Sequence, residues 1–370
     1  MAKVLYTAFT QEGKETNGFV EAMNNKEALV ELKERGLSRI NLLSDTALGF
    51  ERADLDGVSE GELKRIAKFE MQMQKGAGFI PYFVETMRNN AIPLAIGVSM
   101  ALYGESTNSA WWMASGVILS LALPFFSFWN YGVMQTHTSL MKAVSFGEWE
   151  AVKTLSEDLK KQSKNPDITI EADTRLAAYH AHQGDMNEAL KVMMPHKSYL
   201  EKSAGVYENK LGELYYHAGE YDKCVYQMKK AYEVSGENMM LADWAFAEVR
   251  FGDMQVAKKC LSQVEIETLP SFGLPFIEFI EGVIAYKENN LIEAKEMLTH
   301  SLEGFSHFDK NPVVWGPLAM VSCYLALVLA ALGERESAEV ILSEGVVKIA
   351  KEHAEVVLLE KMKEEFPTYF

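Results

Sequence analysis

An internal repeat in the C-terminal two thirds of the chain constrains the fold most strongly. A Gly, or once an Asn, recurs five residues before a position that is usually small, and an apolar or aromatic residue usually lies between them. The steps between copies are 37, 35, 33, 37 and 44 residues, at Gly147, Gly184, Gly219, Gly252, Asn289 and Gly333. A period near 34 residues indicates helix-turn-helix units that stack into a solenoid.

The residues at these positions suit paired helices. We predict positive φ in the turns at Gly184, Gly219, Gly252 and Gly333, because glycine adopts it without steric cost. We predict close helix crossings at Ala189, Ala257, Ala294 and Ala338. The long last step indicates an inserted loop around Ser306 to Trp315, and Lys348 to Glu365 indicates a charged capping helix. The copy at Gly147 is either a weak repeat or the continuation of an upstream helix.

The repeat region, from Ser139 to about Ala350, resembles tetratricopeptide repeat (TPR) proteins. The clearest copy is NKLGELYYHAGEYDKCVYQMKKAYEV, in which Leu211, Gly212, Tyr215, Gly219, Tyr221 and Ala231 match the signature. The resemblance implies a TPR-like α-solenoid whose concave groove binds a protein partner. The groove residues that it implies are Asn209, Glu213, Tyr216, His217, Phe246, Arg250, Phe279, Tyr286 and Lys287. For Phe246 and Phe279, packing between repeats is the alternative.

A stretch almost free of charge precedes the repeats. Between Ala91 and Gln135 the one charged residue is Glu105. The apolar run Ala110 to Met134, about 25 residues, is longer than the roughly 30 Å hydrocarbon layer at 1.5 Å per residue. The run Ala91 to Tyr103 covers only about 20 Å and would require local thinning of the bilayer. We predict a transmembrane helical hairpin over residues 91–134, with a buried globular hairpin as the alternative.

The distribution of basic residues predicts the orientation of this hairpin. Basic residues lie on both sides of the apolar pair and none lies in its loop, and cytoplasmic flanks are enriched in Lys and Arg. The flanking residues are Lys64, Arg65, Lys68, Lys75 and Arg88 before the pair, and Lys142 and Lys153 after it. We therefore expect both termini to lie on the cytoplasmic side of the inner membrane. Residues 51–90 are predicted to be a linker and a juxtamembrane helix.

The first 50 residues predict a small α+β module. Alternating runs over Val4 to Thr10 and Thr16 to Met23 flank a polar turn, which indicates a β-hairpin. Asn24 and Glu27 form a capping-box pattern before a short helix that ends near Gly36, and a third strand follows at Arg39 to Leu43. The predicted fold class is thus mainly α: a ββαβ module, a membrane hairpin, and a helical repeat domain over residues 135–370.

The N-terminal run YTAFTQEGKETNGFVEAMNNKEALVELKERGLSRINL resembles the N-terminal segment of platform (F-type) proteins of type II secretion and type IV pilus machines. The match covers about a tenth of the chain and is carried by Tyr6, Ala8, Gly13, Gly18, Ala22, Ala28, Leu32, Gly36, Leu37 and Ile40. The duplicated helical domains and three membrane helices of those proteins are absent from this sequence. We interpret the segment as a borrowed module.

Composition narrows the chemistry. The chain has 370 residues and a net charge of −16, which argues against nucleic-acid binding through bulk charge. About −13 of this charge falls after Gln135, so a basic or aromatic-rich partner is easier to recruit electrostatically. Cys224, Cys260 and Cys323 lie far apart and indicate neither disulfides nor a zinc site, and His180 and His182 point to different helix faces. No enzyme signature or cofactor motif occurs.

These features together predict a membrane-anchored, non-enzymatic scaffold that binds proteins through its solenoid. Two alternatives remain open at this point. One is an accessory subunit of a secretion or pilus machine, which the N-terminal resemblance motivates. The other is a pore-forming or membrane-disrupting oligomer controlled by the repeats, for which the small residues Ala114, Ser115 and Gly116 would permit close helix contacts. A homo-oligomer is compatible with any of the three.

Overall fold

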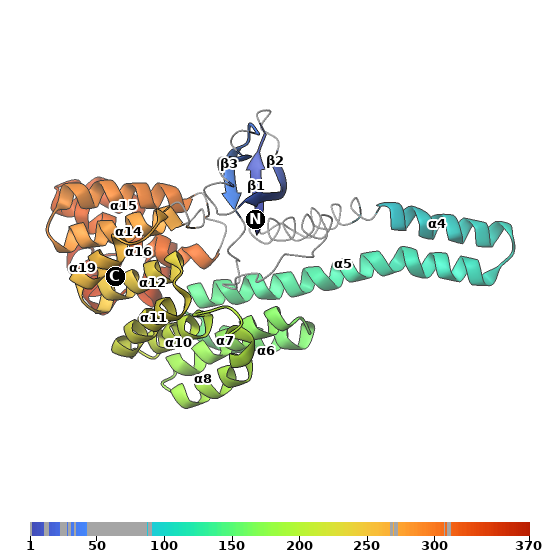
Figure 1. The fold of residues 1–370 in the computed structure, drawn as a ribbon, viewed down its shortest axis with the longest axis horizontal. Helices are drawn as coiled ribbons and strands as arrows, with labels where there is room; N and C mark the ends of the chain where they lie inside the picture. The colour runs from blue at the N-terminus through green and yellow to red at the C-terminus, as the bar shows by residue number, and fades with distance from the viewer. Residues whose placement is uncertain are drawn as a thin grey trace.

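The structure is a computed structural model and is mainly helical (Figure 1). It describes residues 2–10, 15–22, 28, 31–32, 35–42, 87, 91–266, 269, 273–306, 308 and 312–370. Within these ranges the side chains of residues 123–130 and of several strand residues are not described. The predicted linker and juxtamembrane helix, and the Asn24–Glu27 capping box, lie outside the described residues.

A three-stranded antiparallel sheet forms the N-terminal unit. Its strands are β1 (Ala2–Phe9), β2 (Glu15–Ala22) and β3 (Ser38–Leu42), in the order β2-β1-β3. The hairpin and the third strand therefore lie where the sequence predicts them. Alternate residues point to the same face of a strand, and Tyr6, Ala8 and Val20 are buried together with Ala28 and Leu32. Tyr6 pairs with Gly18, which leaves room for its ring.

Two helices form an arm that extends away from the rest of the chain (Figure 1). Helix α4 (Ala91–Ser106) packs along the first part of α5 (Ala110–Ser145). At 1.5 Å per residue, the 16 residues of α4 span about 24 Å and the 36 residues of α5 about 54 Å. The predicted pair of apolar helices is therefore present, and the second continues well beyond Met134 into the repeat region.

Glycines allow the backbones of α4 and α5 to touch. A Cβ at Gly116 would overlap the Gly97 carbonyl oxygen and the Ala101 backbone, and a Cβ at Gly104 would overlap the Met113 backbone. A Cβ at Gly97 would come within 2.6 Å of the Ser120 hydroxyl. Because these contacts involve backbone atoms, no side-chain rotation can relieve them. Gly116 is thus a packing residue of the hairpin, whereas Ala114 is exposed.

The remaining helices stack in pairs, each helix packing on its neighbours in the sequence. They are α6 (Trp149–Gln162), α7 (Pro166–His182), α8 (Met186–Met193), η1 (Met194–His196), α9 (Lys197–Leu200), α10 (Val206–His217), α11 (Tyr221–Ser235), α12 (Asn238–Phe251), α13 (Met254–Leu261), α14 (Gly273–Lys287), α15 (Leu291–Ser306), η3 (Pro312–Val314), α16 (Trp315–Ala331), α17 (Arg335–Ile341), α18 (Glu344–His353) and α19 (Val356–Glu365). Their order matches the predicted helix-turn-helix repeats.

The repeat positions behave as predicted with one exception. The turn residues have positive φ at Gly147, Gly184, Gly219, Asn289 and Gly333, and all four predicted small alanines are fully buried. Gly252 differs, because its φ is −120°. A Cβ there would overlap the Glu248 carboxylate, which accepts a hydrogen bond from the Asp253 backbone N–H at 2.8 Å. Glycine is therefore required at position 252 because the Glu248 side chain approaches its backbone closely, and not because the turn has a positive φ.

One helix in the described part of the chain is long and apolar enough to cross a membrane by length and composition. It covers Pro312–Ala331, and 72% of its most apolar window is buried inside the protein. These residues join the largest hydrophobic core, between α14, α15, α18 and α19. The burial identifies α16 as a core helix of the solenoid. Ala91–Ser106 and Ala110–Ala122 are shorter apolar helical stretches.

The predicted single capping helix at Lys348 to Glu365 is wrong. The segment forms two helices, α18 and α19, separated by Ala354 and Glu355 in extended conformation, with ψ angles of 149° and 152°. The last carbonyls of a helix have no partner within it. The His353 carbonyl oxygen instead accepts hydrogen bonds from Tyr216 Oη at 3.0 Å and Arg250 Nη2 at 2.6 Å. These long-range contacts hold the break in place.

The last helices return to the end of α5. Ser145 Oγ donates to the Pro312 carbonyl oxygen at 3.0 Å, and His353 Nε2 lies 3.2 Å from the Ser145 carbonyl oxygen. Lys348 Nζ lies 2.9 Å from a Glu148 carboxylate oxygen, beside the same turn. The first and last helices of the solenoid therefore meet, and the helix that leaves the arm ends at their junction.

We expect Gly116→Ala to separate α4 from α5. Overpacking costs about 1–3 kcal/mol, so amide exchange in residues 96–103 should quicken by about tenfold or more, measured by hydrogen–deuterium exchange in mild detergent. Gly132→Ala is the matched control, because a Cβ at Gly132 of the same helix meets nothing within 4 Å. Equal protection in both variants would contradict the glycine-dependent pairing.

Candidate interaction groove

Three neighbouring helices, α10, α12 and α14, supply all nine groove residues that the sequence implies. Tyr216, Arg250 and Tyr286 contact the returning C-terminal helices. Asn209 and Glu213 lie one or two turns earlier on α10, in a separate polar network. The structure thus brings Tyr216 and Arg250 together at the α18–α19 break, where the chain itself contacts them.

A ladder of basic side chains runs through four consecutive copies of the repeat, one in each. Each member lies two residues before the repeat Gly or Asn, at or next to the last residue of α7, α10, α12 or α14: His182, His217, Arg250 and Lys287. Cations near a helix C-terminus interact favourably with its partial negative charge. The sequence analysis identified three members from the family resemblance, and the common repeat position would also have found His182. We call these four residues the basic ladder.

Arg250 is the best-enclosed member of the ladder. Its guanidinium carbon lies 5.1, 4.9 and 4.6 Å from the ring centroids of Tyr216, Phe246 and Phe251. Its Nε lies 3.3 Å from a Glu355 carboxylate oxygen, and both side chains are less than 10% exposed. Burial disfavours the charge, but the neighbouring Tyr216 and Glu355 raise the pKa of Arg250 above its ordinary value. Arg250 therefore remains charged inside an aromatic cage.

Two buried histidines of this region, His217 of the ladder and His353 at the α18–α19 break, are uncharged near neutral pH. His217 packs edge-on against Trp149, with ring centroids 5.1 Å apart. His182 stacks on the same Trp149 ring at a centroid distance of 4.3 Å. Burial lowers the pKa of His217 to about 3. Burial, followed by the Arg250 charge, lowers the pKa of His353 to about 4. Near neutral pH both imidazoles act as uncharged, packed groups.

The downstream residues contribute mainly to packing. Phe279 is only 1% exposed, and Phe246 packs 5.4 Å from it, so the packing alternative describes Phe279. Lys287 Nζ donates to the Val249 carbonyl oxygen at 2.5 Å, and burial lowers the pKa of Lys287. Tyr286 Oη accepts from Lys361 Nζ of α19 at 3.3 Å.

A buried charge network occupies the upstream part. Arg175 of α7 bridges Glu171 and Glu213, and Lys210 Nζ lies 3.3 Å from a Glu213 oxygen. Despite burial, Arg175 and Lys210 hold the pKa of Glu213 well below its usual range. Asn209 Nδ2 donates to Asp243 at 2.9 Å, while burial raises the pKa of Asp243 to about 6. Asn209 and Glu213 therefore already have partners within the fold.

The sequence analysis missed Glu171, Arg175, Tyr324 and Glu355. Tyr324 of α16 donates to the Glu355 carboxylate, and Arg175 links α7 to α10. None of these residues occupies a position that the family resemblance carries over. An unusually buried charge is visible only once the helices are assembled, so sequence spacing offered no signal for these residues.

No family model matches the chain, and no curated protein sequence matches it significantly. Within the described ranges, no group of three or more His, Cys, Asp or Glu side chains is placed to hold a metal ion. The three cysteines are buried and free, and burial raises the pKa of Cys224 and Cys260 to about 11.

We expect Arg175→Met to lower the free energy of unfolding by about 3–5 kcal/mol, because it leaves the buried Glu171 carboxylate without its cation and Glu213 with Lys210 alone. Lys191→Met is the control, since its pair with Glu188 on α8 is exposed and should be worth less than about 1 kcal/mol. Urea titration followed by far-UV circular dichroism compares the two. Similar losses in both variants would contradict the network's role.

We expect stability to fall by about 2 kcal/mol between pH 7 and pH 5. Unfolded histidines bind protons near pH 6.5, whereas folded His217 and His353 bind them only near 3 and 4, so acid favours the unfolded chain. Asp243, which the fold protonates near pH 6, opposes part of this loss. Urea titrations at both pH values measure it.

The His217→Gln variant should lose most of this pH dependence. His300→Gln, at a half-exposed position on α15, should retain it. A full pH dependence in His217→Gln would show that another group is responsible.

Proposed function

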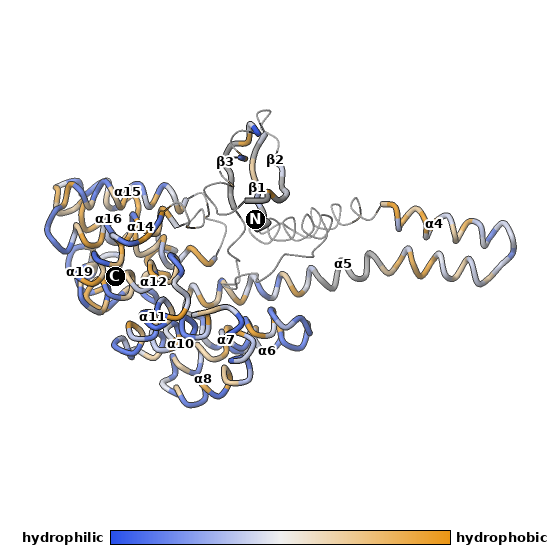
Figure 2. Tube along the Cα trace, viewed as in Figure 1, coloured by the Kyte–Doolittle hydropathy of each residue, from blue (hydrophilic) through white to orange (hydrophobic). Residues whose placement is uncertain are grey.

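We propose that this chain is a membrane-anchored, non-enzymatic scaffold that binds partner proteins through its C-terminal solenoid. The observation that carries the proposal is the α4–α5 arm, which has apolar residues along both helices (Figure 2) and exposes many of them to its surroundings. The two helices pack on each other through glycines. The solenoid supplies the repeated helix pairs on which protein-binding surfaces are commonly built.

The arm exposes large apolar side chains on both helices. They include Ile92, Ile96, Val98, Leu102, Trp111, Val117, Ile118 and Leu121, each at least 44% exposed. Soluble monomers rarely expose a contiguous apolar patch of this kind. The buried globular hairpin considered in the sequence analysis would instead bury these residues. A bilayer accounts for their exposure.

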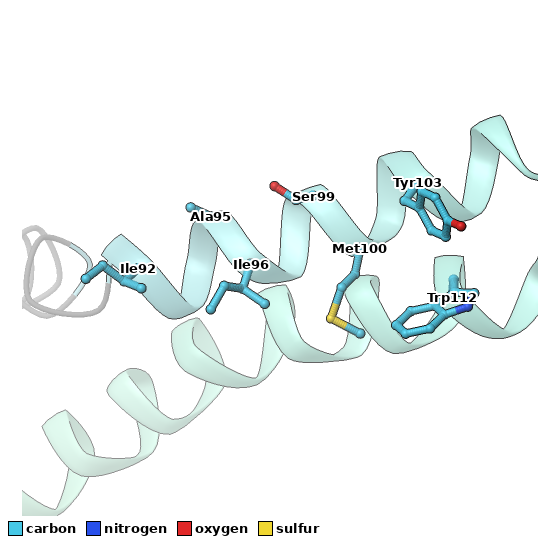
Figure 3. Close-up of a pocket in the computed structure, with 7 residues that line it drawn as sticks. All are labelled: Ile92, Ala95, Ile96, Ser99, Met100, Tyr103 and Trp112. Carbon is cyan, nitrogen blue, oxygen red and sulfur yellow. The ribbon is translucent and has the colours of Figure 1, made fainter.

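The inner contacts of the arm also suit a lipid environment. Helices in a membrane associate through small residues that let their backbones approach closely, because lipid removes the hydrophobic drive between them. Gly97, Gly104 and Gly116 provide such an approach. Beside it lies an open apolar groove of about 430 Å³, where Tyr103 and Trp112 meet edge to face at 6.0 Å (Figure 3). Acyl chains would fill this groove in a bilayer.

Both termini are proposed to face the cytoplasm. The end of α4 carries Glu105, and the loop of residues 107–109 has no basic residue, while Lys142 and Lys153 lie where α5 joins the solenoid. The positive-inside rule then places the solenoid in the cytoplasm, at the inner membrane. Helix α4 is shorter than the hydrocarbon layer, so we propose that the bilayer thins locally around the arm.

A second candidate function is an accessory subunit of a secretion or pilus machine. It is favoured by the N-terminal sheet, because Tyr6, Ala8, Ala28 and Leu32, which carry the platform-protein resemblance, form its buried core. Under this proposal the ββαβ module docks onto such a machine while the solenoid recruits further proteins. Co-purification of the full chain with an assembly ATPase would separate this candidate from a general scaffold.

We expect Ile118→Lys to weaken membrane association, because a charge at the centre of a membrane helix costs about 2.5–3.5 kcal/mol on insertion scales. Val340→Lys is the matched control, since Val340 is 84% exposed on the solenoid. Vesicle flotation and alkaline carbonate extraction measure retention in the membrane fraction. If both variants remain fully bound, the arm is not the anchor.

A further inference from the structure

We propose that the solenoid groove is a binding site for an extended acidic segment of a partner protein, and that residues 352–355 occupy this site when no partner is present. The inference rests on the proposed scaffold function and names the chemistry that its groove recognises. It assigns a role to the α18–α19 break that packing alone does not require.

Residues 353–355 lie in the groove like a bound peptide. Ala354 and Glu355 have extended backbone angles, and three separate helices contact the segment through polar groups. Tyr216 of α10 and Arg250 of α12 donate to the His353 carbonyl oxygen, at 3.0 and 2.6 Å. Two residues further on, the Glu355 carboxylate meets Arg250 Nε at 3.3 Å and the Tyr324 hydroxyl of α16.

These contacts recognise a backbone carbonyl and a carboxylate, and they do not depend on the shape of any other side chain. The Ala354 methyl group adds little chemical information between them. Any extended segment with an acidic residue two positions after a free carbonyl can therefore present the same groups. An arginine that binds carboxylate in an aromatic cage is also a recurrent device for acidic-motif recognition.

The charged groups that face the groove determine the sign of the charge that a bound segment should carry. Glu352 contributes to the electrostatic environment of His182, and Glu355 to those of Arg250 and Lys287, so the acidic residues three apart lie along the basic ladder. The net charge of the repeat region, about −13, favours a basic partner at long range. At the groove itself Arg250, the buried cation of the ladder, reverses that preference and favours an acidic segment.

Displacement of the resident segment would reach the membrane arm. His353 Nε2 lies 3.2 Å from the Ser145 carbonyl oxygen, and Ser145 is the last residue of α5. A partner that replaces residues 352–355 therefore loosens the junction between the first and last solenoid helices. Partner binding and the end of the membrane helix are thus coupled through one segment.

The test uses the full chain in mild detergent and two synthetic peptides. The first carries the resident sequence Lys351 to Val357 with blocked ends, and the second has glutamine in place of both glutamates. Glu355→Gln weakens the resident contact while preserving side-chain volume. Glu288→Gln is the control protein, because it removes one partner of the exposed Lys258–Glu288 pair.

In Glu355→Gln we expect amide exchange in residues 344–365 to quicken at least tenfold, with the other helices still protected. The acidic peptide should bind the Glu355→Gln variant at least tenfold more tightly than it binds the wild type. The same variant should bind the acidic peptide at least tenfold more tightly than the glutamine peptide. Adding Arg250→Gln should abolish this preference for the acidic peptide. Glu288→Gln should behave as the wild type.

Three results would overturn the inference. One is equal binding of the two peptides to Glu355→Gln, and another is equal binding of the acidic peptide to wild type and variant. The third is loss of the whole helical signal in Glu355→Gln, which would make residues 352–355 an inseparable part of the fold. Vesicle flotation of the same variants distinguishes failure of this inference from failure of the proposed function. Membrane retention without peptide binding would contradict this inference and would still agree with a membrane-anchored scaffold.

Discussion

Helix α5 joins the two halves of the molecule as one continuous rod. Its first part pairs with α4 through backbone contacts at glycines, and its last part packs against α6 and the returning C-terminal helices. Helix α5 runs for 36 residues from the apolar arm to the first helices of the repeat array. The arm and the repeat array are therefore connected by a single helix.

Closure of the solenoid depends on polar groups that are removed from water. An arginine, two tyrosines and a glutamate meet at the α18–α19 break, where the low local dielectric strengthens their attraction and makes any unpaired member costly. The same reasoning applies upstream, where Arg175 holds two carboxylates together. Arg250 and Arg175 thus each tie together helices that are distant in the sequence, at sites where their charges are paired.

The acidic surface and the basic ladder act over different distances. Net charge governs encounter over a Debye length of about 8–10 Å, whereas Arg250 acts on a group in direct contact. A chain with a strongly negative solenoid can therefore hold a carboxylate at its centre. Under the proposed function, the net charge would affect how fast a partner associates, and the contact with Arg250 would affect how long it stays bound.

Local patterns in the sequence predicted much of the architecture. The repeat glycines marked the helix pairs, the charge-free stretch marked the α4–α5 arm, and alternating residues marked the sheet, because each signal involves neighbours within one or two helical turns or strands. The family resemblance grouped Tyr216, Arg250 and Tyr286, and all three contact the returning C-terminal helices. The local patterns failed at Gly252, whose backbone is set by the Glu248 side chain, and at α18–α19, whose break is held by distant residues.

The sequence by itself determined the element types, the repeat period and the apolar arm, since these depend on periodicity and local composition. Only the tertiary structure decided that α16 is a core helix, that the ends of the helical array meet, and that Tyr216 and Arg250 contact the His353 carbonyl oxygen. The last two features require contacts between residues more than 100 positions apart, as in the Arg250–Glu355 pair. No local pattern encodes such a pairing, because it arises from the accumulated geometry of the stacked helices.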